Sequence, residues 1–195
     1  MKKILICGDS FAADWTVKYP GMGWPNLLAE KYDVMNLAQA GCGEYKIYQQ
    51  LSSVDLSLFD YIIVFHTSPT RLHTPFHPIH HSDPLHHSSD FIYTDVKDYS
   101  KMNAELAPVV KYFENFFDLE HATFMHGLVC ARIEQLLLPY RVIHATGILW
   151  DNLYQFKNMV DYSKFAKPNV GNLNHYDPRT NVFVYEDLIS RLKHT

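Results

Sequence analysis

The chain lacks the features that mark secreted, membrane-spanning or nucleic-acid-binding proteins. It has only three cysteines, Cys7, Cys42 and Cys130, and this odd, widely spaced set predicts reduced thiols rather than a disulfide framework. No apolar run approaches the length of a membrane span. A formal net charge of −4 and the lack of a Lys/Arg-rich stretch argue against nucleic-acid and anionic-membrane partners. We therefore expect a cytoplasmic protein whose ligands are small or neutral.

The remaining composition is that of a globular domain. With 195 residues, 47% of them hydrophobic and 19% charged, the chain can bury one substantial core. Neither an internal repeat nor a domain boundary is evident, so we expect a single domain over residues 1–195. Lys2 and Lys3 precede only a short apolar run without a small-residue cleavage site, which we interpret as a first strand rather than a secretion signal.

Strand-like and helix-like segments alternate along the chain. Short apolar or β-branched runs predict strands over residues 2–7, 33–38, 60–66 and 141–146. Apolar residues at three- and four-residue spacing predict helices over residues 24–31, 44–51, 102–117, 121–138 and 182–192. Such alternation is typical of an α/β protein with a parallel sheet and right-handed crossovers.

The segment from about 73 to 100 interrupts this alternation with His, Pro, Ser and Asp residues. It is too long for an ordinary connection, so we expect an insertion, a lid or a mobile loop near the carboxyl edge of the sheet. The spacing of its histidines matches no defined metal-ligand pattern, and we expect a solvent-exposed loop without a metal or cofactor. These histidines are His73, His77, His80, His81, His86 and His87.

Residues with hydrolytic potential follow the predicted strands. Gly8-Asp9-Ser10 closes the first strand, Gly41 closes the second, and the carboxyl ends of parallel strands meet at one ligand-binding edge. A serine needs a nearby base to act as a nucleophile, and His175, just before the last helix, can reach the same edge. Ser10 and His175 are therefore the candidate nucleophile and base.

This order of features resembles the SGNH (GDSL) hydrolase family of esterases, lipases, thioesterases and carbohydrate deacetylases. Gly8-Asp9-Ser10 resembles the nucleophile block, and residues 36–41, Asn-Leu-Ala-Gln-Ala-Gly, resemble the second block. The resemblance implies a flavodoxin-like, three-layer α/β/α sandwich around a central parallel sheet. It also implies that the N–H groups of Ser10 and Gly41 bind the oxyanion.

Two further blocks of the family are matched in part. Where the family ends its third strand in Gly-x-Asn-Asp, residues 66–71 read His-Thr-Ser-Pro-Thr-Arg, which makes Ser68, and in second place Thr67, the candidate oxyanion donor. Where the family has Asp-x-x-His, residues 172–175 read Asn-Leu-Asn-His. His175 matches, and Asn172 stands at the position of the aspartate.

The group that orients His175 is left open by these residues. Asn172 is one candidate, and Asp151, Asp161 and Asp177 are carboxylates within or beside the same irregular region. A backbone carbonyl could also hold the imidazole tautomer, which would leave a Ser-His dyad.

Three residues near the predicted edge are candidates for substrate binding: Asp9, Thr67 and Arg71. The Arg71 guanidinium could clamp a carboxylate or phosphate, or else serve as a surface salt bridge or a loop brace. Aromatic residues in the flanking segments suit sugar rings and acyl chains equally. They are Trp15, Tyr19, Trp24 and Trp150.

Together these features predict a serine esterase that hydrolyses a small acyl or acetyl ester, on a carbohydrate among other alcohols. The alternative is a binding module that keeps the hydrolase scaffold without efficient chemistry, because the asparagine and aspartate of the family blocks are replaced.

Overall fold

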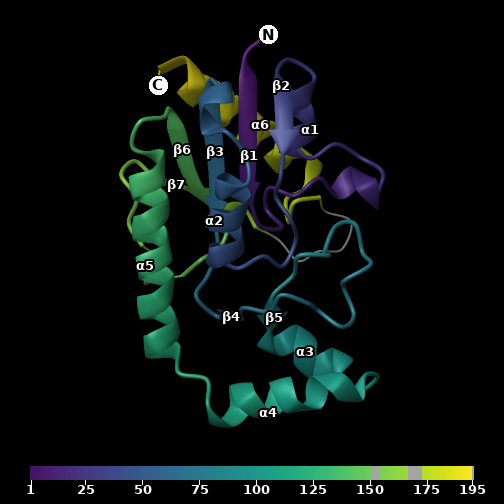
Figure 1. Cartoon of the computed structure of the whole chain (residues 1–195). Helices are drawn as coiled ribbons and strands as arrows, with labels where there is room; N and C mark the ends of the chain where they lie inside the picture. Colours follow the sequence, from purple (N-terminus) through teal and green to yellow (C-terminus); the bar gives the residue numbers. More distant parts are fainter. Residues whose placement is uncertain (151–153, 167–172, 195) are drawn as a thin grey trace.

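A five-stranded parallel sheet forms the centre of the protein (Figure 1). The computed structural model describes residues 1–150, 154–166 and 173–194. The sheet order is β2-β1-β3-β6-β7. The strands are β1 (Lys3–Gly8), β2 (Asp33–Asn36), β3 (Tyr61–His66), β6 (Val142–Thr146) and β7 (Val160–Asp161). The first four confirm the strands expected from the sequence, and β7 was not expected.

Helices cover both faces of the sheet, which confirms the three-layer α/β/α arrangement. On one face lie α1 (Trp24–Ala29) and α6 (Pro178–His194), and on the other α2 (Glu44–Ser52) and α5 (Leu119–Leu137) (Figure 1). Along β1, Ile4 and Ile6 face the first pair of helices, whereas Leu5 faces the second. This alternation follows from the two-residue period of a strand, and it explains the unbroken apolar runs of β1 and β3.

The insertion lies beyond the carboxyl ends of the sheet strands (Figure 1). It begins after β4 (Arg71–Leu72), which forms a small antiparallel hairpin with β5 (Phe91–Ile92), and it ends with α3 (Tyr93–Tyr99). The next helix, α4 (Ala107–Asn115), lies within the helix expected over residues 102–117. The expected irregularity therefore ends at Asp90, ten residues earlier than the sequence suggested. Leu85 is buried in the core and its carbonyl accepts from the N–H of Ala40 at 3.0 Å, so the insertion is packed onto the domain.

Within the described part of the chain, no helix combines the length and apolar character needed to cross a lipid bilayer.

Candidate active site

The turn after β1 brings Ser10 to the carboxyl edge of the sheet. Gly8 adopts φ +153°, and a Cβ at this position would lie 2.8 Å from the carbonyl oxygen of Phe65. Glycine is therefore required where β1 passes β3. The Asp9 carbonyl then accepts hydrogen bonds from the N–H groups of Ala12 and Ala13, both at 3.0 Å, which reverses the chain and leaves Ser10 at the turn.

Hydrogen bonds of the Asp9 and Arg71 side chains hold this turn in place. The Asp9 carboxylate accepts from the Phe11 N–H at 3.0 Å and from Arg71 Nη2 at 2.9 Å, and Arg71 Nη1 donates to the Cys42 carbonyl at 2.7 Å. Burial raises the pKa of the Asp9 carboxyl, and the guanidinium opposes that shift. Asp9 is fully buried and is not among the residues that line the cavity beside Ser10, whereas Arg71 lines it.

The second turn places Gly41 opposite Ser10. Gly41 adopts φ +81°, and its carbonyl accepts from the Asp90 N–H at 3.0 Å. Ser89 packs against the glycine, in the space that a Cβ would need, and donates from Oγ to the Ala40 carbonyl at 2.8 Å. Among the described residues, neither the Gly41 N–H nor the Ser10 N–H donates a hydrogen bond. Both are thus available to a ligand oxygen.

A cavity of about 920 Å³ connects these groups. Ser10, Gly41, Arg71 and His175 line it and come from four separate segments of the chain. Trp15 and Tyr19 contribute aromatic surface, as the sequence predicted, whereas Trp24 is buried in the core, stacked on Phe65 at 4.9 Å, and Trp150 lines a different cavity. The structure therefore brings the predicted nucleophile, one oxyanion donor and the predicted base to one place.

His175 is held in the cavity wall by strained backbone and aromatic packing. His175 and Asn174 adopt φ +60° and +53°, and the Asn174 amide donates to the Ala13 carbonyl at 2.6 Å. The His175 ring lies 4.5 Å from that of Phe11. Burial, with the positive charge of Arg71 nearby, lowers the pKa of His175 to about 4. The imidazole is therefore neutral at pH 7 and able to accept a proton.

The structure does not join His175 to Ser10 by a hydrogen bond among the residues it describes, and His175 Nε2 is buried without a partner. Of the candidates that could orient the ring, Asn172 and Asp151 lie outside the described residues. Asp161 accepts from the Ser163 N–H at 2.7 Å and lines another cavity. Asp177 caps α6 by accepting from the Thr180 N–H at 2.8 Å.

Ser68 and Thr67 are not among the residues that line the cavity containing Ser10. Thr67 is fully buried, with its N–H bound to Glu44 Oε2 at 3.1 Å and its carbonyl to His126 Nε2 at 2.9 Å. Ser68 Oγ is bonded to Thr70 Oγ1 at 2.8 Å and lines a second cavity of about 410 Å³. These contacts hold the chain after β3 toward α2 and α5, so neither predicted residue lines the cavity that holds Ser10.

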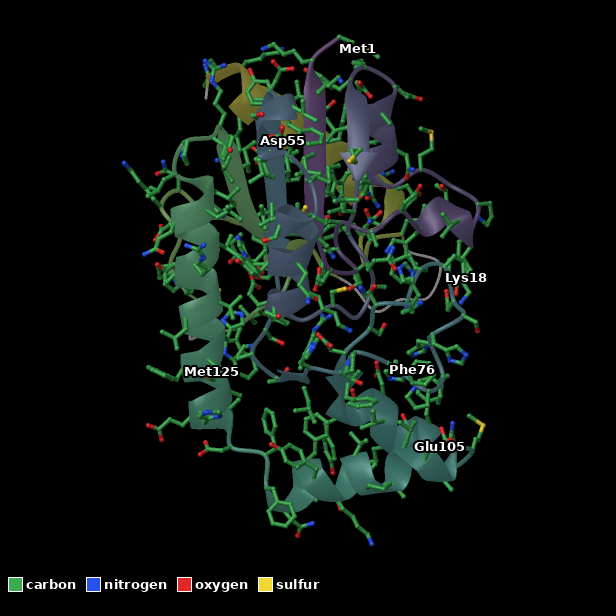
Figure 2. All side chains as sticks on the ribbon, viewed as in Figure 1. Met1, Lys18, Asp55, Phe76, Glu105 and Met125 are labelled. Atoms are coloured by element: carbon green, nitrogen blue, oxygen red, sulfur yellow. The ribbon has the colours of Figure 1, made fainter. Side chains whose placement is uncertain are left out.

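The sequence analysis missed Asp83 and His86, which also line the Ser10 cavity. Their Oδ2 and Nδ1 atoms lie 3.3 Å apart, and Lys18, which lines the same cavity and is labelled in Figure 2, contacts Asp83 Oδ2 at 2.6 Å. Although burial acts to raise it, hydrogen bonds from Lys18 and the Leu85 N–H bring the pKa of Asp83 to about 2. The three-residue spacing of Asp83 and His86 in the sequence could have indicated that the two side chains interact.

The insertion is also less exposed than its composition suggested. His77 is only 2% exposed, and burial lowers its pKa to about 4. The expectation of a wholly solvent-exposed histidine loop is therefore wrong. Within the described residues, no three insertion histidines bring their ring nitrogens together as metal ligands would.

The fold and the cavity define an α/β protein with a serine at the carboxyl edge of its parallel sheet. No family model matches the chain, and no curated protein matches its sequence. Among solved structures it is similar to a protein from Desulfitobacterium hafniense DCB-2 that is described as lipolytic and of the G-D-S-L family. The identity is 13%, the TM-score is 0.39, and the match covers 98% of this chain and 99% of that one.

Proposed function

We propose that the protein is a serine esterase that hydrolyses a small acyl ester, with Ser10 as nucleophile and His175 as base. One observation supports the proposal above the others. Ser10 and Gly41, whose N–H groups make no hydrogen bond among the described residues, line one cavity together with a neutral, buried histidine. A nucleophile, unpaired N–H donors and a base within one cavity are the parts that acyl transfer needs.

In this proposal Ser10 Oγ attacks the ester carbonyl while His175 takes the hydroxyl proton. The N–H groups of Ser10 and Gly41 stabilise the oxyanion of the tetrahedral intermediate. Collapse of the intermediate breaks the ester C–O bond, and His175 returns the proton to the leaving alcohol. Water then attacks the acyl-serine by the same route, which releases the acid and restores Ser10.

The cavity lining favours an ester of a polar alcohol, such as an acylated carbohydrate. Trp15, Tyr19 and Tyr99 offer aromatic faces, while Arg71 and Asp95 offer charged hydrogen-bonding groups. Sugar rings combine apolar faces with hydroxyl edges and so use both kinds of surface.

Labelling with a fluorophosphonate probe tests the nucleophile directly. We expect the wild type to form one covalent adduct on Ser10, and Ser10→Ala to lose both the adduct and p-nitrophenyl acetate hydrolysis. Ser82→Ala, an exposed serine of the insertion, is the matched control and should leave both unchanged. Hydrolysis that survives Ser10→Ala would exclude the proposed mechanism.

The missing Ser10–His175 hydrogen bond favours a second candidate, a binding module on the same scaffold. It predicts no covalent labelling of folded protein and saturable retention of acylated carbohydrates in a binding assay. Stoichiometric labelling of Ser10 would exclude it.

A further inference from the structure

A cluster of metal-binding side chains lies on the opposite side of the sheet from the α1/α6 face and takes no part in the proposed esterase. Glu44 opens α2, His66 ends β3, and His126 and Cys130 lie one turn apart on α5. Their side chains are only 2%, 1%, 6% and 0% exposed. Three elements far apart in the sequence therefore converge on one dry polar site.

The donor atoms are grouped closely enough to share one ion. One carboxylate oxygen of Glu44, one ring nitrogen of His66 and Cys130 Sγ all lie within 4.8 Å of one another. His126 is not within this distance of all three residues, but its Nδ1 lies 3.6 Å from Cys130 Sγ and its Nε2 lies 3.5 Å from Glu44 Oε2. In a tetrahedral zinc site, Zn–N near 2.1 Å and Zn–S near 2.3 Å place neighbouring N and S atoms roughly 3.6 Å apart. The His126–Cys130 pair already has this spacing.

Outer hydrogen bonds orient both histidines, with His66 Nδ1 facing Glu44 and His126 Nδ1 facing Cys130. His126 Nε2 lies 2.9 Å from the Thr67 carbonyl, which can only accept, so Nε2 carries the proton. His66 Nε2 lies 2.9 Å from His144 Nδ1, while His66 Nδ1 faces Glu44. The Thr67 N–H fixes the other Glu44 oxygen at 3.1 Å. Ligand histidines in metal sites are typically oriented in this way through their second nitrogen.

Charge and access also suit a divalent cation. A Glu carboxylate, a Cys thiolate and two neutral imidazoles carry two negative charges, which a divalent ion cancels, and a neutral set is what a buried site favours. Glu44 and His126 also line the 410 Å³ cavity, which offers an entry path. Met125 of α5, which is labelled in Figure 2, also lines this cavity.

We propose that Glu44, His66, His126 and Cys130 bind a zinc-class divalent cation in a closed site that ties α2, β3 and α5 together. Binding releases the Cys130 thiol proton to solvent, and the His66 ring proton is carried on Nε2, toward His144. Glu44 Oε1 and His66 Nδ1, now 2.6 Å apart, separate by roughly 0.7 Å to reach ligand spacing. Four protein ligands leave no open position, which is typical of a structural rather than a catalytic site.

Metal loading of the full chain tests this site. After incubation with Zn²⁺ and removal of the excess, we expect one tightly held zinc ion per chain by elemental analysis. Loading with Co²⁺ should give a thiolate-to-cobalt charge-transfer band in the near ultraviolet and the visible bands of a four-coordinate ion. Cys130→Ser should abolish the charge-transfer band, and His126→Gln should weaken zinc binding by at least about 100-fold.

Two matched controls separate this site from adventitious binding. Cys42→Ser removes another buried thiol, and His81→Gln with His87→Gln removes exposed insertion imidazoles, so both should keep the zinc and the cobalt spectrum. Folded wild type that holds no stoichiometric zinc, or zinc that is lost only with His81 and His87, would overturn the proposal. The cobalt spectrum of the wild type decides the question even if a ligand variant fails to fold.

Discussion

At the scale of single residues, the proposed mechanism requires His175 to be neutral when it takes the proton of Ser10. His175 is buried near Arg71, and its pKa is lowered to about 4. His86 lines the same cavity at 3.3 Å from Asp83 and is a second imidazole that could serve as the base. Substitutions and pH profiles can separate the two.

We expect His175→Gln to reduce kcat of ester hydrolysis at least about 100-fold, because a positioned base contributes on that order. His86→Gln, the matched change on the same cavity wall, should reduce kcat less than tenfold. Steady-state hydrolysis of p-nitrophenyl acetate by both variants measures this, and the reverse ranking would make His86 the base.

The pH profile follows from the low pKa of His175. A general base works only when deprotonated, so kcat/KM should stay level from pH 8 down to pH 5.5 and fall only as the pH approaches about 4. A base with an ordinary histidine pKa would already lose activity near pH 6.5. A decline centred near pH 6.5 would therefore contradict the proposed role.

The Asp9–Arg71 pair makes a separate prediction about stability. Arg71→Met leaves a fully buried carboxylate without its counter-charge, which should cost about 3–5 kcal/mol of unfolding free energy. Because burial raises the pKa of Asp9, lowering the pH protonates the carboxyl and should relieve part of this cost. Urea unfolding at pH 7 and pH 5 measures both effects. The Asp9→Asn, Arg71→Met double variant should recover much of the loss.

At the scale of elements, the close pairing of β1 with β3 at Gly8 and Phe65 determines where the turn with Ser10 begins. Gly8 combines a positive φ with van der Waals contact to the Phe65 backbone, and both conditions exclude a side chain. The position of the nucleophile turn thus depends on one residue that carries no chemistry.

We expect Gly8→Ala to destabilise the protein by at least about 1–3 kcal/mol, because the backbone conformation and the Phe65 carbonyl both oppose a Cβ. Gly127→Ala is the matched control within α5, where a Cβ would meet no heavy atom within 4 Å. It should stabilise the protein by about 1 kcal/mol through helix propensity. Thermal unfolding of the two variants gives opposite shifts if this reasoning is correct.

At the scale of the whole molecule, buried neutral histidines should make the fold sensitive to mild acid. The pKa values of His77 and His175 are both lowered to about 4, whereas an unfolded histidine titrates near 6.5. Between these values the unfolded chain binds more protons than the folded one, so stability is full above pH 6.5 and falls as the pH drops toward 4.

Urea midpoints measured from pH 7 to pH 4.5 test this expectation. His175→Gln should flatten the pH dependence, whereas the exposed His81, changed to Gln, should leave it unchanged. Equal pH dependence in all three proteins would show that His175 does not contribute.

The layered architecture could be predicted because it depends on local patterns. The apolar runs of β1 and β3 indicate strands buried on both faces, and glycine after a strand indicates a turn at the sheet edge. The position of Ser10 and Gly41 could be predicted as well, since the carboxyl ends of parallel strands meet at one edge of the sheet. Strand β7 could not be predicted, because two residues are too few to show a strand pattern.

The alternation of strands and helices, and the residues that end each strand, follow from local sequence patterns. The direction of those side chains and the burial of the insertion depend on how the folded chain packs. Ser68 lines a different cavity from Ser10 because hydrogen bonds of Thr67 to Glu44 and His126 hold the chain after β3. His77 is buried although its polar neighbours in the sequence predict an exposed loop, because burial depends on the residues that pack around the ring. Both outcomes depend on contacts between residues far apart in the chain, which local sequence patterns do not record.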